Sequence, residues 1–211
     1  MITLTEIRQY APHDLRAWFI LAASTGFVAT AIAGGALATT HGRLIVAGLA
    51  LCWVGDMTGP INFVGGALAF LFAHVFLIGG FISQGPIRRH VAITAGVALL
   101  VSGSSFIWIY PHIHPGHLPL ILSYMLIIST MVAFAGGIIT INRITLVAAI
   151  IFYASDFFLA CSKYIPHTSV NELYYGPLYY TACILFAVSA WKKGPFRGVG
   201  AETDGLERGG P

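Results

Sequence analysis

Residues 43–57 read RLIVAGLALCWVGDM, an apolar run that begins at an arginine and ends at an aspartate. The rest of the chain is similarly apolar, with 57% hydrophobic residues, 9% charged residues and a mean hydropathy of +0.81. Soluble domains contain roughly 25% charged residues, so this composition indicates an integral membrane protein. Asp56 is therefore an ionisable group inside a membrane-spanning segment, where such groups are costly and usually functional.

A spanning helix needs roughly 20 mostly apolar residues. By this measure the sequence predicts about seven spans, which consume most of the chain and predict an all-α polytopic transmembrane helix bundle. One transmembrane domain is expected over 17–191, with an N-terminal segment at 1–16 that could lie at the membrane interface. Residues 192–211 are expected to form a flexible cytoplasmic tail, since they contain too few large apolar residues to fold alone. The predicted spans lie at about 17–38, 43–58, 61–82, 91–110, 118–140, 144–165 and 172–191.

Basic residues divide unevenly between the two sides of such a bundle. The side that holds the N-terminus carries Arg8, Arg16 and Lys163. The positive-inside rule therefore predicts a cytoplasmic C-terminus and a non-cytoplasmic N-terminus, in the inner or plasma membrane of a bacterium. The more basic side carries Arg43, Arg88, Arg89, Arg143, Lys192, Lys193, Arg197 and Arg208.

A second aspartate occurs in a matching frame. Residues 143–157, RITLVAAIIFYASDF, align with the opening stretch at an offset of 100 residues, which pairs Arg143 with Arg43 and Asp156 with Asp56. Few pairs are identical, but the two spans lie four apart and enter from the same side, as a weak parallel four-helix internal repeat requires. Asp56 lies about 20 Å of helix from Arg43, so both carboxylates are expected in the outer half of the membrane.

The third predicted span adds a histidine in the middle of the membrane. FVGGALAFLFAH, residues 63–74, places four side chains on one helical face, namely Phe63, Gly66, Phe70 and His74. His74 is a candidate for ligand binding or proton transfer, with a buried packing role as the alternative. In the fifth predicted span, Tyr124, Met131 and Ala135 also share a face, which fits a packing stripe as well as a pocket wall.

In their order and spacing, these motifs resemble those of the YhhN-type lysoplasmalogenase family of membrane hydrolases. The resemblance covers about residues 43–191. The chain differs from the family pattern in two ways. The family usually carries eight spans with both ends cytoplasmic, whereas about seven are predicted here. In addition, Cys183 stands where the last span of the family has a glutamine. The matching residues are Gly55, Asp56, Phe63 to His74, Leu118 to Ala135, Ser155, Asp156 and Tyr179.

The resemblance implies hydrolysis of the vinyl ether bond of lysoplasmalogens to a fatty aldehyde and a glycerophospho-head group. It implies a lysophospholipid substrate taken from the lipid bilayer, with no cofactor, metal or nucleic acid. Vinyl ether cleavage needs a protonated carboxyl group to protonate the β-carbon and an ionised one to stabilise the oxocarbenium ion. The expected catalytic residues are Asp56, Asp156 and His74, facing one cavity open toward the non-cytoplasmic half, and the expected substrate-binding residues are Tyr124, Tyr179, Phe70 and Ser155.

Two other functions fit the same residues. The loop YPHIHPGH, residues 110–117, offers His112, His114 and His117 as ligands for a metal-dependent membrane lipid hydrolase, although its prolines and glycine also fit an irregular turn with solvated imidazoles. Alternatively, the paired aspartates could form the proton path of a small proton-coupled transporter. Broken helices at Gly59-Pro60 and Gly176-Pro177 would favour that function.

Overall fold

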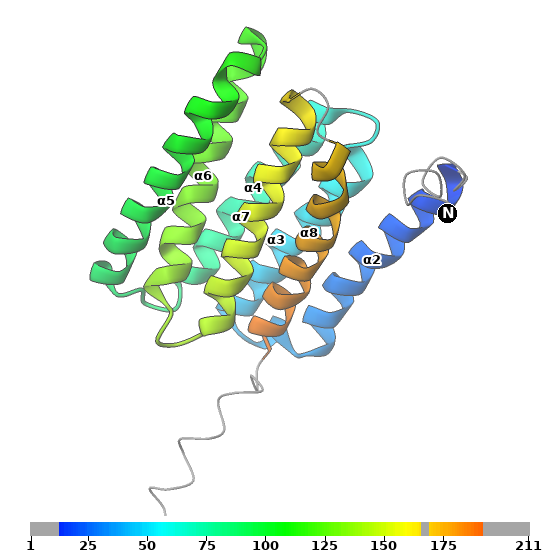
Figure 1. Cartoon of the computed structure of the whole chain (residues 1–211). Helices are drawn as coiled ribbons and strands as arrows, with labels where there is room; N and C mark the ends of the chain where they lie inside the picture. Colours follow the sequence, from blue (N-terminus) through cyan, green and yellow to red (C-terminus); the bar gives the residue numbers. More distant parts are fainter. Residues whose placement is uncertain (1–12, 166–168, 192–211) are drawn as a thin grey trace, which may run out of the picture.

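The computed structural model describes residues 13–165 and 169–191, and its regular elements are all helical. Each of the seven α-helices of this described part coincides with one predicted span, which confirms the all-α bundle (Figure 1). Residues 1–12 and 192–211, which include most of the expected N-terminal segment and the tail, lie outside the described residues. The helices are α2 His13–Ala33, α3 Thr40–Thr58, α4 Phe63–Ile82, α5 Arg88–Ile109, α6 Leu118–Gly137, α7 Arg143–Tyr164 and α8 Ser169–Ser189.

The connections are short and contain three 3-10 turns, η1 Ala36–Ala38, η2 Tyr110–His112 and η3 Pro115–His117. The first predicted span was too long at its end, because α2 stops at Ala33 and the chain turns at Gly35, whose φ of 76° is left-handed. Two helices begin with side-chain caps: Thr39 accepts from the N–H of Gly42 ahead of α3, and Asn62 from that of Gly65 ahead of α4.

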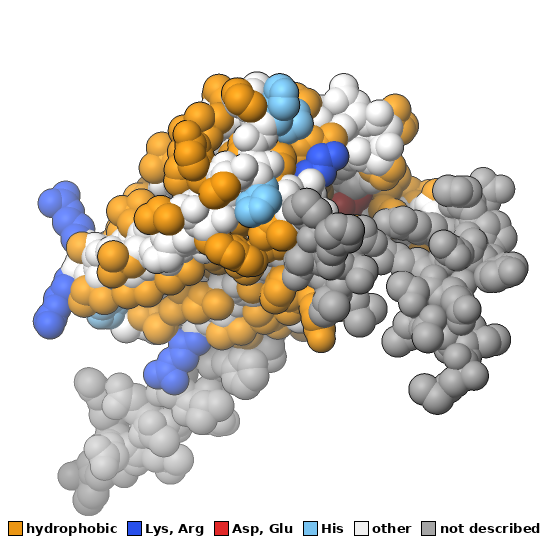
Figure 2. Space-filling view, turned by 45° about the horizontal axis from the view of Figure 1, so that its top comes forward, with side chains coloured by type: hydrophobic (Ala, Val, Ile, Leu, Met, Phe, Trp, Pro, Cys, Tyr) orange, Lys and Arg blue, Asp and Glu red, His pale blue; other side chains and the backbone are white. Residues whose placement is uncertain are grey.

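Length and composition identify four helical stretches that could cross a membrane in the described residues, in α4, in α5 with η2, in η3 with α6, and in α7. A shorter apolar stretch, Ala17–Ala33, lies in α2. The exterior is itself apolar: on α5, Leu100 and Ile107 are 74% and 76% exposed. Figure 2 shows hydrophobic side chains covering much of the visible face, with basic side chains at its left and lower edge and another farther in. Such an exterior suits contact with lipid and would be unusual in water.

Consecutive helices alternate in direction, so α3, α5 and α7 run one way and the other four run the opposite way (Figure 1). The closest packing joins α3 to α4 and α7 to α8, while α2 packs against α3 and α8, and α6 against α4 and α5. We call the end at which α3, α5 and α7 begin the basic end, and the opposite end the distal end. The aspartate-bearing helices α3 and α7 are therefore parallel, in agreement with the orientation that the internal repeat requires.

Glycines allow α3 and α4 to pack closely toward the distal end. A Cβ at Gly66 would lie 2.6 Å from the Cα of Gly59, and one at Gly55 would lie 2.7 Å from the Phe70 ring. Real side chains do not approach so closely, so both positions need glycine. Gly66 thus sets the spacing between α3 and α4, and Gly55 makes room for the ring of Phe70.

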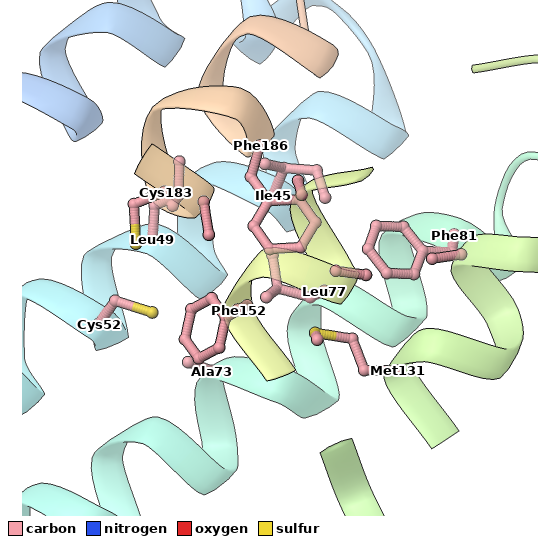
Figure 3. Close-up of a cluster of buried hydrophobic side chains, with 14 of the residues drawn as sticks. Ile45, Leu49, Cys52, Ala73, Leu77, Phe81, Met131, Phe152, Cys183 and Phe186 are labelled. Atoms are coloured by element: carbon pink, nitrogen blue, oxygen red, sulfur yellow. The ribbon is translucent and has the colours of Figure 1, made fainter. Parts of the chain in front are cut away.

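The hydrophobic core lies one helical turn nearer the basic end than the candidate site. Cys52 precedes Asp56 by one turn on α3, Phe152 precedes Asp156 by one turn on α7, and on α8 Cys183 follows Tyr179 by one turn. Because α8 runs opposite to α3 and α7, all three core residues lie on the same side of their site partners. Figure 3 shows this core, which includes Leu49, Leu77, Phe81, Met131 and Phe186. It forms a closely packed apolar floor beneath the carboxylates.

Candidate active site

Asp56, in the last turn of α3, receives hydrogen bonds from two other helices. Its Oδ2 accepts one from Ser24 Oγ of α2 at 2.5 Å and one from the Tyr179 hydroxyl of α8 at 2.9 Å. Two hydroxyl donors converging on one oxygen suit an ionised carboxylate, which offers only acceptors. Ser24 is fully buried, and sequence reasoning missed it because one serine in an apolar run has no distinctive spacing.

Asp156, on α7, lies beside His74 of α4 and Tyr124 of α6. Its Oδ2 is 3.9 Å from Nε2 of His74, and the Tyr124 side chain is close enough to interact with the carboxyl group. The histidine is fully buried, and the carboxyl side chain is 14% exposed. Neither Nε2 nor Oδ2 has a hydrogen-bond partner among the described residues. Buried polar atoms in this state usually indicate a proton, water or ligand that completes the site.

The tautomer of His74 follows from its other ring nitrogen. Nδ1 lies 2.6 Å from the backbone carbonyl oxygen of Phe70. A carbonyl oxygen can only accept, so Nδ1 carries the hydrogen and the neutral ring turns the lone pair of Nε2 toward Asp156. At 3.9 Å the two atoms lie beyond hydrogen-bond distance, so a proton passes between Oδ2 and Nε2 only through a water or after a small movement of a side chain.

A chain of aromatic contacts connects the two carboxylates. The His74 ring packs edge-on against Phe152 with centroids 5.0 Å apart, and Phe152 packs against Tyr179 at 5.5 Å. Phe70, in the space left by Gly55, also packs against Tyr179 at 5.7 Å. The structure thus brings together the predicted residues Asp56, Phe70, His74, Tyr124, Asp156 and Tyr179, and adds Ser24 and Phe152.

Other singled-out residues make structural contacts. The Ser155 hydroxyl donates to the carbonyl oxygen of Tyr175 at 2.8 Å and ties α7 to α8, so a role in binding substrate stays a prediction for this residue. Met131 and Ala135 are fully buried in the core, which favours the packing interpretation of the α6 stripe. Cys183, at the position where the resemblance expects glutamine, is buried in the same core.

The single cavity expected around Asp56, His74 and Asp156 stays a prediction. A cavity of about 270 Å³ lies along the 110–118 connection, lined by Tyr110, Pro111, Ile113, Pro115 and Leu118. Both aspartates are nevertheless partly exposed. Figure 2 shows a small patch of acidic atoms at the surface, close to a basic side chain.

The three loop histidines do not form a chelating cluster. No group of three or more His, Cys, Asp or Glu side chains in the described part of the chain is placed to hold a metal ion. Nδ1 of His114 accepts from the N–H of Gly116 at 3.2 Å, and Nδ1 of His117 lies 3.3 Å from the Tyr164 hydroxyl. This loop therefore supplies no ligand set for the metal-dependent alternative.

The helix breaks expected of a transporter are also missing at the predicted positions. Gly59-Pro60 lies in the turn after α3, and Pro177 lies inside α8, which continues through it. Neither aspartate is next to an unwound segment within its helix, because Asp56 and Asp156 both lie in regular helical turns.

One protein family matches most of the chain. The model of the YhhN family matches residues 16–190, a range that includes every site residue from Ser24 to Tyr179. No curated protein and no solved structure matches the chain.

Proposed function

Because the chain belongs to the YhhN family, we propose that it is a membrane hydrolase that cleaves the vinyl ether bond of lysoplasmalogens. The observation that carries the proposal is the contrast between the two carboxyl groups. Oδ2 of Asp56 accepts two hydroxyl hydrogen bonds, whereas the carboxyl group of Asp156 has one hydroxyl, that of Tyr124, beside it, and its Oδ2 has no partner in the described chain and lies 3.9 Å from Nε2 of His74. Asp56 is arranged to remain an anion, and Asp156 is arranged to carry and release a proton.

In the first step, Asp156 donates its proton to the β-carbon of the vinyl ether. The electron pair of the double bond forms the new C–H bond, and the ether oxygen shares the positive charge that develops on the α-carbon. Asp56, held as an anion by Ser24 and Tyr179, stabilises this oxocarbenium ion electrostatically. A positioned general acid of this kind contributes about 10²- to 10⁴-fold in rate.

In the second step, water adds to the α-carbon and gives a hemiacetal. The proton that water loses returns to the pair formed by Asp156 and His74, which restores the acid for the next cycle. The hemiacetal then breaks its bond to the glycerol oxygen, and a proton moves to that oxygen. The products are a fatty aldehyde and a glycerophospho-head group whose glycerol hydroxyl is free, so one water is consumed and no cofactor is needed.

The same proposal places the distal end of the bundle on the non-cytoplasmic side. Arg43, Arg88, Arg89 and Arg143 all lie at the beginnings of α3, α5 and α7, which is the basic end. By the positive-inside rule this end faces the cytoplasm, together with the C-terminus that follows α8. Both carboxylates would then receive substrate from the outer half of the membrane.

The decisive test is an incubation of the purified protein with a lysoplasmalogen and, separately, with the matching 1-acyl lysophospholipid. We expect fatty aldehyde from the first and no fatty acid from the second. A chelator in a parallel reaction tests the metal-dependent alternative, and we expect aldehyde release to continue in its presence. Fatty acid release without aldehyde, or an activity that disappears with chelator and returns with zinc, would overturn the proposal.

A further inference from the structure

Lys163 holds its ammonium group over an aromatic ring at the distal end of the bundle. The residue lies in the last turn of α7, and its Nζ is 4.6 Å from the centroid of the Phe63 ring. The side chain is exposed, and no carboxylate of the described chain forms an ion pair with it. A cation stacked on an aromatic ring is held in place by a weak attraction, which a stronger anionic partner can replace.

The position of Lys163 is fixed relative to the proposed acid. It follows Asp156 by seven residues, which is about two helical turns, or about 10 Å, along the same side of α7. On α4, Phe63 and His74 occupy one helical face, and each contacts the corresponding residue of α7: Phe63 lies under Lys163, and His74 lies beside Asp156. Asp156 and Lys163 thus lie on the same side of α7, and each is next to a residue from one face of α4.

The surroundings of Lys163 also favour an anion. Phe63 is the first residue of α4, so the positive end of that helix dipole lies beside the ammonium group. His117 packs against the same ring, with centroids 6.4 Å apart, and hydrogen-bonds the neighbouring Tyr164. The distal end also holds Arg16, in the first turn of α2, but Lys163 is the basic residue that the structure places over the Phe63 ring.

We propose that Lys163 binds the phosphate group of the lysophospholipid while the vinyl ether lies at Asp156. This assignment rests on the proposed function. In a lysoplasmalogen the glycerol backbone and its two oxygens separate the vinyl ether carbon from the phosphorus, a span shorter than the rise of about 10 Å between the two residues. The flexible lysine side chain covers the difference by swinging from the Phe63 ring toward Asp156. Because phosphate is common to choline and ethanolamine lipids, this contact selects lysophospholipids without discriminating between those head groups.

A binding experiment tests this assignment independently of turnover. The probe is a radiolabelled 1-O-alkyl lysophosphatidylcholine, which has no vinyl ether and cannot be cleaved by the proposed mechanism, and its partner probe is the matching 1-O-alkylglycerol, which lacks phosphate. We expect Lys163→Gln to weaken binding of the phospholipid probe by about 10- to 100-fold, the effect of losing a charged hydrogen bond. Binding of the alkylglycerol should be unchanged, Lys163→Arg should restore most of the affinity, and the control Arg89→Gln at the basic end should bind both probes normally.

The outcomes separate the two proposals. An equal loss for both probes in Lys163→Gln, or no loss for either, would overturn the phosphate assignment. It would also be overturned if inorganic phosphate displaced the phospholipid probe as effectively as unlabelled lysophospholipid, because the site would then accept free phosphate. If the selective loss occurs but the parent protein releases no aldehyde from lysoplasmalogen, the phosphate site stands and the proposed hydrolysis fails.

Discussion

Nε2 of His74 faces Oδ2 of Asp156 at 3.9 Å, and the hydrogen on Nδ1 is already committed to the carbonyl oxygen of Phe70. This arrangement places an imidazole nitrogen that can accept a proton beside a carboxyl group, across a gap that one water or a small side-chain movement would bridge. The first prediction separates this chemistry from packing. His74→Phe preserves a ring that can pack against Phe152 and Tyr124, but it removes the nitrogen that holds the proton.

We therefore expect His74→Phe to lower the rate of aldehyde release by about 10²-fold or more, with helical content unchanged by circular dichroism. The exposed His112 of the 110–117 loop provides a matched control, and His112→Phe should retain parental activity. Parental turnover in His74→Phe would show that the histidine only fills space.

Asparagine substitutions test the two carboxyl groups. Asp56→Asn and Asp156→Asn should each abolish vinyl ether cleavage, because an amide can neither protonate the β-carbon nor offset the oxocarbenium charge. Both variants should remain folded, since asparagine keeps the shape of the side chain and removes the cost of placing a carboxylate in the membrane. Aldehyde assays and size-exclusion profiles in detergent measure the two effects. Asp204→Asn, the same change in a residue outside the described structure, serves as control; if both site variants turned over normally, the carboxylates would be structural.

Removing the donors to Asp56 should produce a graded loss. Ser24→Ala and Tyr179→Phe each remove one hydroxyl from Oδ2, and a hydrogen bond to a charged group contributes about 1.5–3 kcal/mol. We expect each variant to lose about 10- to 100-fold in kcat, and the double variant to approach the activity of Asp56→Asn. Ser104→Ala is the control for the serine, because Ser104 only bonds a carbonyl oxygen of its own helix. An unchanged rate in both single variants would contradict the role assigned to Asp56.

The α3 and α4 contact makes a prediction about stability. A methyl group at Gly66 would meet backbone atoms of Gly59 at 2.6 Å, which cannot move aside without separating the helices. Gly66→Ala should therefore lower the free energy of unfolding by about 1–3 kcal/mol, seen as a lower Tm in detergent. Gly96→Ala on α5, where a Cβ meets nothing within 4 Å, should keep or slightly raise the Tm. The proposed close packing would be wrong if the two variants behaved alike.

The orientation of the bundle can be measured with fusions. Green fluorescent protein fused after residue 211 should be fluorescent, because we expect the C-terminus in the cytoplasm. Alkaline phosphatase fused within the 110–117 loop at the distal end should be active, because that enzyme needs the non-cytoplasmic side. The reverse pair of results would invert the bundle and place the carboxylates on the cytoplasmic side.

Much of the fold could be predicted from the sequence because the membrane imposes length and polarity on each span. All seven spans correspond to helices, and the parallel arrangement of Asp56 and Asp156 follows from the number of spans between them. The lateral order of the helices could not be predicted, since an apolar exterior provides little amphipathic signal. For that reason Ser24 escaped notice: its role depends on α2 packing beside α3 and α8. The three loop histidines share a short stretch, but only the rings of His114 and His117 lie in contact, with centroids 5.8 Å apart, and no group of three ligands forms in the described chain.

The peripheral helix α5 contributes no side chain to the site, yet it determines that both carboxylates lie toward the same end of the bundle. Helices α2 to α4 cross the membrane an odd number of times, as do helices α6 to α8, so each triplet delivers the chain to the leaflet opposite its entry. Joined directly, the two triplets would be inverted relative to each other, and Asp56 and Asp156 would approach opposite surfaces. The extra crossing by α5, whose apolar side chains are largely exposed, restores the chain to its starting leaflet. It thereby brings Asp56 and Asp156 to the same end of the bundle.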